Sequence, residues 1–289
     1  MTSGPGVLYV VATPIGNLED LTFRALRILR EVDLIAAEDT RRTARLLAHY
    51  EIRKPVVSLR EHNERREAPR LIDRMASGQQ VALVSDAGTP AIADPGARLV
   101  RAARDAGLRV IPIPGPSAVT AAISVAGLPN EQFTFAGFPP AGGTARRTWF
   151  ERLAKEDRAV VFFEAPHRIR RTLRDLRDTL VNRQISVLRE ATKIHEQLVY
   201  LPNMAPAGFT EPERGEFSVV VYPPRDVKPQ KSGDQPTMEN IGQLVESGLF
   251  GPAELETVVS ALNGVPRSVA AKTIRQYNKL VKKQIYKAT

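Results

Sequence analysis

Short apolar runs alternate with longer amphipathic segments through the first half of the chain. Strands are predicted by the apolar runs at 7–12, 33–37, 56–59, 81–84 and 109–113. Apolar positions at helical spacing predict helices over 18–30, 64–77 and 97–106, and one more that ends near Tyr50. Strands that alternate with helices of this length are typical of a parallel sheet built from βαβ units. We therefore expect an α/β fold whose N-terminal sheet is mainly parallel.

The pattern starts again after Pro129. Further strands are predicted over 133–138, 159–163, 185–189, 196–201 and 216–222, and helices over 117–126, 147–155 and 167–181. Because the last three strands follow one another without a helix, the second sheet is expected to be mixed. The pattern thus predicts a second α/β region that follows the first.

The C-terminal end has a different composition. Residues 223–236 are rich in Pro, Lys, Gln and Asp, which is typical of a linker. Two helices are predicted beyond it, over 253–262 and 268–286, and the second is strongly basic. The predicted domains are therefore residues 1–115 and 116–224, followed by a linker and helical tail over 225–289.

Four polar loops follow strands of the first sheet, at 13–17, 38–42, 60–63 and 85–96. Loops at the carboxyl ends of parallel strands meet at one edge of a sheet, where ligands bind. The stretch 81–96, VALVSDAGTPAIADPG, is the most informative, since Gly88 lets the backbone approach a ligand closely. The segment 114–118, PGPSA, then opens a helix whose free N–H groups suit a carboxylate.

Composition narrows the chemistry. The formal net charge is +9 and the sequence pI is near 10.0, which favours a polyanionic partner, nucleic acid first, although an arginine-rich surface is the alternative. Cysteine is absent and the four histidines show no ligand spacing, so no metal is expected. The absence of a long apolar stretch and of a signal-peptide layout predicts a cytoplasmic protein off the membrane. Neither GxxxxGK[ST] nor GxGxxG occurs.

Ordered motifs over about residues 7–222 carry a family resemblance. They are TPIGNL at 13–18, AEDTR at 37–41, HNE at 62–64, SDAGTPAIADPG at 85–96, PGPSA at 114–118, GF at 137–138, FEAPHR at 163–168, REATK at 189–193 and GEF at 215–217. The chain resembles the tetrapyrrole methylase superfamily, and within it the bacterial small-subunit ribosomal RNA (cytidine-2′-O)-methyltransferases. The resemblance implies two α/β domains with S-adenosyl-L-methionine as cofactor in the cleft between them. It also implies 16S-type RNA as substrate, assembled subunits as partner, and a homodimer.

The resemblance also implies site residues. Cofactor contacts are expected from Pro14, Gly16, Asp86, Ala87, Gly88, Thr89, Ile92, Asp94, Gly115, Ser117, Ala118, Phe163 and Glu164. RNA contacts are expected from Arg41, Arg42, Arg60, His62, Asn63, Arg146, Arg147 and Arg168. For any one of these arginines a solvated surface position is the alternative, and His62 is also a candidate base.

Transfer of a methyl group to a ribose hydroxyl requires alignment, and a base or a cation near the oxygen helps. Glu38 and Asp39 are candidate bases, or they pair with Arg41 and Arg42 and shape the loop. Lys193 is a candidate for stabilising the alkoxide, or it is a lysine at a strand end. Two other functions stay open: methylation of a tetrapyrrole or another small molecule, and RNA binding by an assembly factor without turnover.

Overall fold

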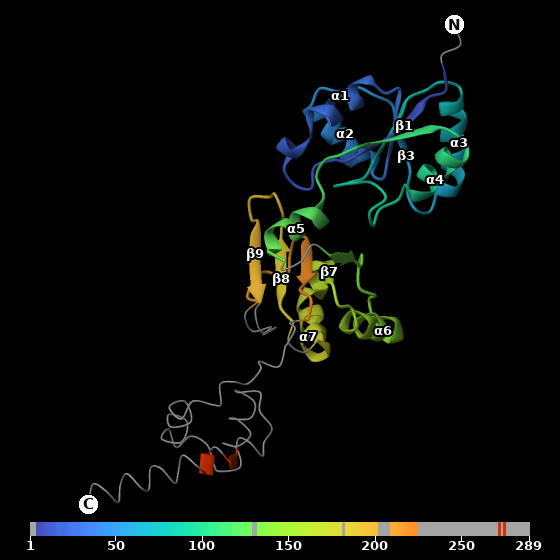
Figure 1. Ribbon diagram of the computed structural model, residues 1–289. Coiled ribbons are helices and arrows are strands. Elements are labelled where there is room, and N and C mark those ends of the chain that lie inside the picture. The colour runs from blue at the N-terminus through green and yellow to red at the C-terminus, as the bar shows by residue number, and fades with distance from the viewer. Residues whose placement is uncertain are drawn as a thin grey trace, which may run out of the picture. The chain divides into compact units, whose positions relative to one another are not determined.

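The computed structural model describes residues 4–128, 132–180, 183–201 and 209–224, together with residues 271, 272, 274 and 275. Residues up to Pro224 form one compact unit that contains two five-stranded sheets (Figure 1). The predicted helix 253–262 and most of the predicted helix 268–286 lie outside the described residues, and the four described residues there are helical. The predicted domain boundaries at 115/116 and 224/225 stay predictions.

The first sheet is parallel throughout. Its strands are β1 (Val7–Val11), β2 (Leu34–Ala37), β3 (Val56–Ser58), β4 (Val81–Val84) and β5 (Arg109–Ile113), in the order β3-β2-β4-β1-β5. Four helices connect them: α1 (Phe23–Glu31), α2 (Thr40–His49), α3 (Glu64–Ala76) and α4 (Ala97–Asp105). The predicted parallel α/β architecture of this half is confirmed.

Alternation along the central strand β4 builds two core layers. Val81 and Leu83 pack into the cluster that α3 and α4 complete, whereas Ala82 and Val84 pack into the cluster that α1 and α2 complete. Side chains alternate between the faces of a strand, so a strand that is covered on both sides must be apolar at every position. This explains why the predicted strand at 81–84 contains no polar residue.

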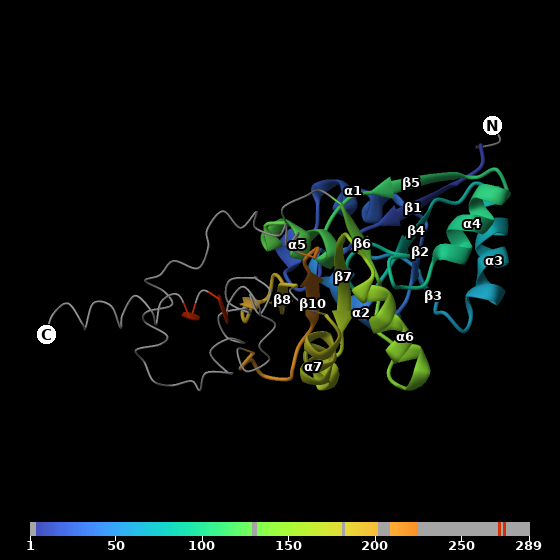
Figure 2. The same ribbon diagram turned by 60° about the horizontal axis from the view of Figure 1, so that its bottom comes forward.

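The second sheet is mixed. Its strands are β6 (Phe133–Phe135), β7 (Ala159–Glu164), β8 (Ile185–Arg189), β9 (Gln197–Leu201) and β10 (Phe217–Val221), in the order β6-β7-β10-β8-β9. Only β6 and β7 run parallel, and the other pairs are antiparallel. Helix α5 (Ala118–Ala126) covers one face, and α6 (Gly143–Ala154) and α7 (Ile169–Thr179) pack against the other (Figure 2). The predicted mixed sheet is confirmed.

Several predicted bounds are wrong for local reasons. The helix predicted over 18–30 is broken: Leu18–Asp20 form a 3-10 turn, and α1 begins only after Thr22, whose hydroxyl accepts the Ala25 N–H at 3.1 Å. The strand predicted over 133–138 ends at Phe135, shortly before the left-handed Gly137 (φ 63°). The helix predicted from residue 147 begins at Gly143. The helix predicted over 167–181 is α7, but it begins only at Ile169, after a 3-10 turn over Pro166–Arg168.

Within the described residues, no helix is long and apolar enough to cross a lipid bilayer.

Candidate active site

The carboxyl ends of β1 and β4 are joined where the strand order reverses. Thr13 donates its N–H to the Gly88 carbonyl and Gly88 returns one to the Thr13 carbonyl, both at 2.9 Å. The Thr13 hydroxyl also donates to the Ser85 carbonyl at 3.2 Å. These bonds hold the loops 13–17 and 85–96 together at the sheet edge, which is where α/β sheets bind ligands.

Loop 85–96 has an unusual backbone. Gly88 and Gly96 have φ of 78° and 123°, and the non-glycine residues Ala91 and Ala93 are also left-handed, with φ of 65° and 64°. Left-handed alanine is strained, and such strain persists only where the surrounding structure enforces it. Residues held this way cluster at ligand sites, so this backbone marks the loop as functional.

A first cavity of about 360 Å³ lies beside this loop. It is lined by Ile15, Ala87, Gly88, Thr89, Ile92, Ala93, Asp94, Ser117, Ala118, Val119, Phe138, Phe163, Glu164, Ala165, Pro166 and Gly215 to Ser218. The ring centroids of Phe138 and Phe163 lie 5.6 Å apart, and Asp94 brings a carboxylate to the lining. Glu164 lines the cavity too, but its carboxylate is buried and pairs with Arg168. We call this space the donor cavity.

The expected S-adenosyl-L-methionine fits the chemistry of this cavity. Its aromatic base matches Phe138 and Phe163, and its positive charges match the carboxylate of Asp94. Helix α5 presents its N-terminus there, and Ser117 makes no side-chain hydrogen bond to cap it. The first N–H groups of a helix lack intrahelical partners, so they suit the donor's carboxylate.

Most predicted cofactor residues line the donor cavity. Those that do are Ala87, Gly88, Thr89, Ile92, Asp94, Ser117, Ala118, Phe163 and Glu164. Pro14, Gly16 and Asp86 line a neighbouring cavity instead. Gly115 lines neither, and a Cβ at this position would meet the Ala12 side chain at 3.0 Å, so this glycine serves close packing against the end of β1.

The neighbouring cavity, of about 350 Å³, is lined by three basic residues and by two acidic ones, Asp86 and Glu216. We call it the basic cavity. Arg42 and Arg45 reach it from α2, and Lys193 reaches it from the loop between β8 and β9. It shares Ile15, Ala87 and Glu216 with the donor cavity, so the two cavities have a common wall. A substrate bound in the basic cavity would therefore lie next to a methyl donor bound in the donor cavity.

Carboxylates at the sheet edge raise one another's pKa. Burial, followed by the charge of Glu38 and then of Asp86, raises the pKa of Asp94 to about 6. Burial and the charge of Asp86 also raise the pKa of Glu38. Asp86 itself accepts the Asp39 N–H at 2.9 Å and pairs with Arg42 at 3.6 Å. A carboxylate with a raised pKa is a better general base near neutrality, and Glu38 is the predicted base with this property, but it lines neither the donor cavity nor the basic cavity.

Asp39 and Lys193 are both held by ion pairs. The Asp39 carboxylate caps α2 by accepting the Arg41 N–H at 2.8 Å, and this bond and the Arg41 side chain lower its pKa. Asp39 therefore makes the contacts of the alternative interpretation, in which it pairs with an arginine and shapes the loop. Burial alone would lower the pKa of Lys193, but Glu190 at 2.8 Å and Glu216 at 3.2 Å outweigh it and raise that pKa. Lys193 therefore stays protonated beside the basic cavity.

Two of the predicted RNA-contact arginines are held by carboxylates of the protein itself. Arg146 is buried: its guanidinium binds Asp175 at 2.7 Å and the Thr172 hydroxyl at 2.8 Å. Arg168 pairs with the buried Glu164 carboxylate at 2.6 Å, to which Thr172 also donates. Both arginines thus belong to a polar network behind the donor cavity wall. A sequence shows that an arginine is present, but not which side of a helix it faces.

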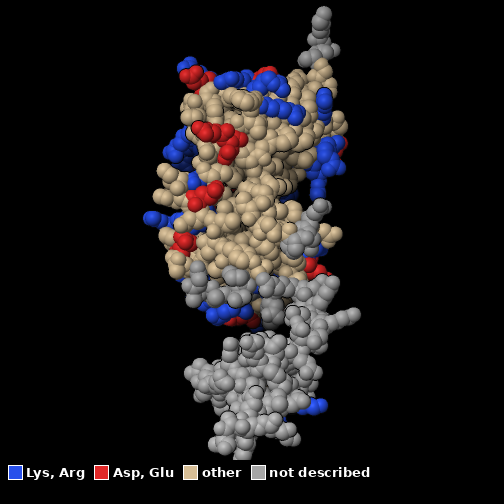
Figure 3. Space-filling model, turned by 60° about the vertical axis from the view of Figure 1, so that its left-hand side comes forward, with Lys and Arg blue, Asp and Glu red and all other residues tan. Residues whose placement is uncertain are grey.

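The other predicted RNA-contact residues lie nearer to solvent. Arg41, Arg42, Arg60, His62 and Arg147 are exposed. Arg60 also donates to the Glu38 carbonyl at 3.1 Å. The Asn63 amide is used within its own loop, since it accepts the Arg60 N–H at 2.7 Å and donates to the Ser58 carbonyl at 3.1 Å. Lys and Arg side chains lie on the face that Figure 3 shows, around a broad uncharged area.

Sequence reasoning did not name Ile15, Val119, Phe138, Ala165, Pro166 or residues 215–218 as lining of the donor cavity. Except for Val119 and Ser218, these residues lie within the motifs TPIGNL, GF, FEAPHR and GEF, which were the signals that pointed to them. Among the described residues, no group of three or more His, Cys, Asp or Glu side chains is arranged to hold a metal ion.

Solved structures share this fold. A diphthine synthase matches with a TM-score of 0.60 and 18% identity, covering 75% of this chain and 90% of that one. The cobalt precorrin-4 methyltransferase CbiF matches with a TM-score of 0.55 and 18% identity, covering 75% and 94%. At these identities the likeness establishes the fold, and the predicted tetrapyrrole-methylase-like fold is confirmed.

Curated relatives are closer in sequence. The Xylella fastidiosa protein named ribosomal RNA small subunit methyltransferase I is 47% identical over 271 residues, which cover 92% of this chain and 97% of the relative. The Vibrio cholerae protein of the same name is 39% identical over 290 residues, covering 99% and 94%. The similarity therefore extends over nearly the whole length of both proteins.

The family pattern of tetrapyrrole (corrin/porphyrin) methylases matches residues 7–204. This match confirms the predicted family, and with it a methyltransferase whose methyl donor is S-adenosyl-L-methionine. The chain belongs to the tetrapyrrole methylase family and groups there with the proteins named ribosomal RNA small subunit methyltransferase I.

Proposed function

We propose that this protein transfers a methyl group from S-adenosyl-L-methionine to the ribose 2′-hydroxyl of a cytidine in small-subunit ribosomal RNA. The names of the relatives support this RNA as the substrate. The motif resemblance supports the cytidine 2′-hydroxyl as the acceptor. The protein acts in the cytoplasm, on assembled subunits, as a homodimer.

One observation carries this proposal. The donor cavity shares Ile15, Ala87 and Glu216 with a cavity that Arg42, Arg45 and Lys193 line. Methyl transfer requires the acceptor oxygen beside the methyl carbon, on the side away from the sulfur. A nucleotide in the basic cavity meets this requirement and places its phosphate among cations, whose contacts fix position on a nucleic acid.

The reaction is a displacement at carbon. The donor supplies a methyl group on a positively charged sulfur. One O–C bond forms while one C–S bond breaks. Glu38 is our candidate acceptor of the hydroxyl proton because its pKa is raised. Since Glu38 lines neither cavity, the proton would reach it through a water molecule. The protonated Lys193 stabilises the negative charge that develops on the oxygen. Because the Asp39 carboxylate accepts the Arg41 N–H, we assign Asp39 a role in shaping the loop and not in proton transfer.

Donor affinity is expected to fall at acid pH. The pKa of Asp94 is about 6 in the free protein, and a bound cation favours its carboxylate form. Below pH 6 Asp94 is protonated before the donor binds, so affinity should decrease by up to about tenfold per pH unit. Calorimetric titrations between pH 5 and pH 8 measure this change. Asp94→Asn should bind more weakly at pH 8 and show little change across pH 6; an equally steep dependence in this variant would exclude Asp94.

Loss of Arg45 is expected to weaken RNA binding without affecting the donor. Arg45→Gln removes a cation from the basic cavity, and a hydrogen bond to a charged group contributes about 1.5–3 kcal/mol, so the KM for subunits should rise roughly tenfold or more. The salt dependence of binding should flatten by about one unit of slope. Arg74→Gln on α3 is the matched control, because it removes the same charge at an exposed position. Equal effects of both variants would contradict a specific phosphate contact.

The homodimer is tested by sedimentation equilibrium of the full chain. A mass near twice 31.8 kDa at micromolar concentration is expected, and a monomer would contradict the proposal.

A further inference from the structure

Glu64 is a buried carboxylate that the reaction does not use. It is the first residue of α3, is only 4% exposed, and directs its side chain at the start of α4. Its Oε1 accepts three backbone N–H groups, from Gly96 at 3.1 Å, Arg98 at 2.9 Å and Leu99 at 3.2 Å. A single oxygen of α3 therefore binds three N–H groups at the start of α4.

Helix α4 has no cap from its own sequence. The N-cap position is Gly96, which has no side chain to accept these N–H groups. No larger residue fits there, because φ is 123° and a Cβ would lie 2.7 Å from Leu83 Cδ2. The Glu64 carboxylate replaces the missing cap, and the positive end of the α4 dipole favours its negative charge.

The capped turn ends the strained loop 85–96. Ala91 and Ala93 are left-handed, and Ile92, Ala93 and Asp94 line the donor cavity only two to four residues before Gly96. At its other end the loop is fixed by the Thr13–Gly88 pair and by Asp86. Strained residues keep their conformation only where the surrounding structure enforces it. Glu64 holds the second end.

We propose that Glu64 is a positioning residue for the methyl donor: by capping α4 it keeps Ile92, Ala93 and Asp94 in the conformation that binds S-adenosyl-L-methionine. This proposal rests on the donor cavity of the proposed function. Glu64 does not line the donor cavity, so it acts through the loop. This role gives a reason for the glutamate that follows His62 and Asn63 after the loop at the end of β3.

Substitutions separate this role from general stability. Glu64→Gln keeps a side-chain oxygen that accepts the three N–H groups, and its donor Kd should stay within about threefold of the original. Glu64→Leu removes the acceptor, and its Kd should rise roughly 10- to 100-fold, whereas kcat at saturating donor stays within about threefold. Glu67→Leu, one turn further along α3, is the control, because among the described residues the Glu67 carboxylate pairs only with Arg66 and Arg70.

Calorimetry of donor binding to the full chain provides the first readout, and hydrogen exchange of the Gly96, Arg98 and Leu99 amides the second. Exchange should accelerate in Glu64→Leu and not in Glu64→Gln. If Glu64→Leu does not fold, Glu64→Asp takes its place: it keeps the charge but withdraws the oxygen by one methylene, and its Kd should rise several-fold.

Unchanged donor affinity in Glu64→Leu or Glu64→Asp would overturn the proposal, as would a Glu64→Gln variant that binds as weakly as Glu64→Leu. Because donor binding is measured without RNA, failure of this proposal is distinct from failure of the proposed function. Tight donor binding by the original protein without transfer to ribosomal RNA would refute only the latter.

Discussion

Asp86→Ala is expected to slow methyl transfer to ribosomal subunits by roughly 10²-fold, because misplacement of reacting groups by about 1 Å has effects of this size. The Asp86 carboxylate ties the loop after β4 to the start of α2: it accepts the Asp39 N–H at 2.9 Å and pairs with Arg42 at 3.6 Å. Its removal frees both groups beside the wall that the two cavities share. The rate of label transfer at saturating donor and subunits measures the effect.

Asp86→Asn is the matched variant. Its amide oxygen still accepts the Asp39 N–H, but the charge opposite Arg42 is lost, so an intermediate decrease of about tenfold is expected. Both variants remove a negative charge that raises the pKa of Asp94 and of Glu38. The acid limb of the donor-binding profile should therefore shift to lower pH in each. Asp86→Ala with an unchanged transfer rate would contradict the role of this loop.

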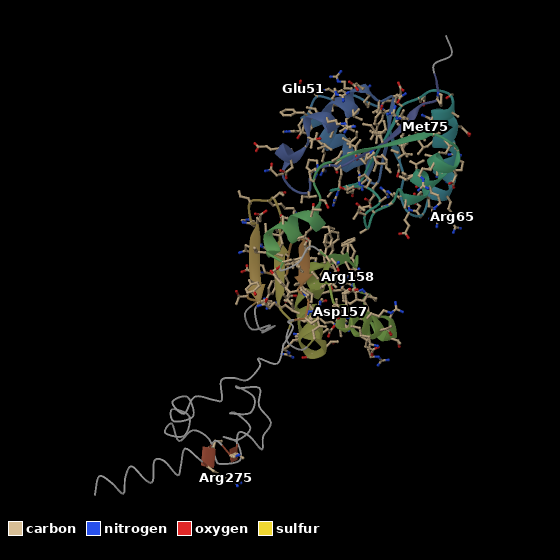
Figure 4. All side chains as sticks on the ribbon, viewed as in Figure 1. Glu51, Arg65, Met75, Asp157, Arg158 and Arg275 are labelled. Carbon is tan, nitrogen blue, oxygen red and sulfur yellow. The ribbon has the colours of Figure 1, made fainter. Side chains whose placement is uncertain are left out.

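The largest expected effect on stability comes from Arg183→Met. Arg183 is 3% exposed and donates to four backbone carbonyls: Tyr222 at 2.6 Å, Leu153 at 3.0 Å, Glu156 at 2.9 Å and Arg158 at 3.0 Å. Figure 4 marks Asp157 and Arg158 in the turn between α6 and β7 that these bonds hold. Without the guanidinium, at least two buried carbonyls lose a charged donor, which costs about 3–5 kcal/mol of unfolding free energy.

Urea unfolding followed by the fluorescence of Trp149 measures this loss, since the chain contains one tryptophan and it packs against Phe162 in the same core. Arg177→Met is the control: Arg177 is about half exposed and pairs with the adjacent Asp178, so its loss should change stability by no more than about 0.5 kcal/mol. Equal losses of unfolding free energy in the two variants would contradict a stabilising role of the bonds from Arg183 to the carbonyls.

The sequence predicted the strands and most helices, because the spacing of apolar residues differs between β-strands and amphipathic helices. The fully apolar run at 81–84 predicted a central strand, and the structure places it between β1 and β2. The break before α1 was missed because helical spacing continues through Leu18 and Leu21 although the backbone is extended at Leu21 and Thr22. Apolar spacing does not report such a local change of backbone.

The donor cavity was largely predictable, since glycine, proline and aspartate in 85–96 and the segment PGPSA mark loops at strand ends. The partners of charged side chains were not. Arg146 and Arg183 look alike in the sequence, since each lies just before a predicted helix or strand. Only the tertiary structure shows that Arg146 binds Thr172 and Asp175, and that Arg183 binds backbone carbonyls. Likewise, the sequence names Glu38 and Asp39 together, and only geometry separates the capping carboxylate from the one with a raised pKa.

Small subunits from cells that lack this protein, incubated with it and methyl-labelled S-adenosyl-L-methionine, test the central claim most directly. Digestion of the RNA to nucleosides should place the label on 2′-O-methylcytidine, and Asp86→Ala should abolish most of it. Free ribosomal RNA and a porphyrinogen serve as competing acceptors in parallel reactions. Label on a base or on the porphyrinogen alone, or no transfer despite tight subunit binding, would contradict ribose methylation.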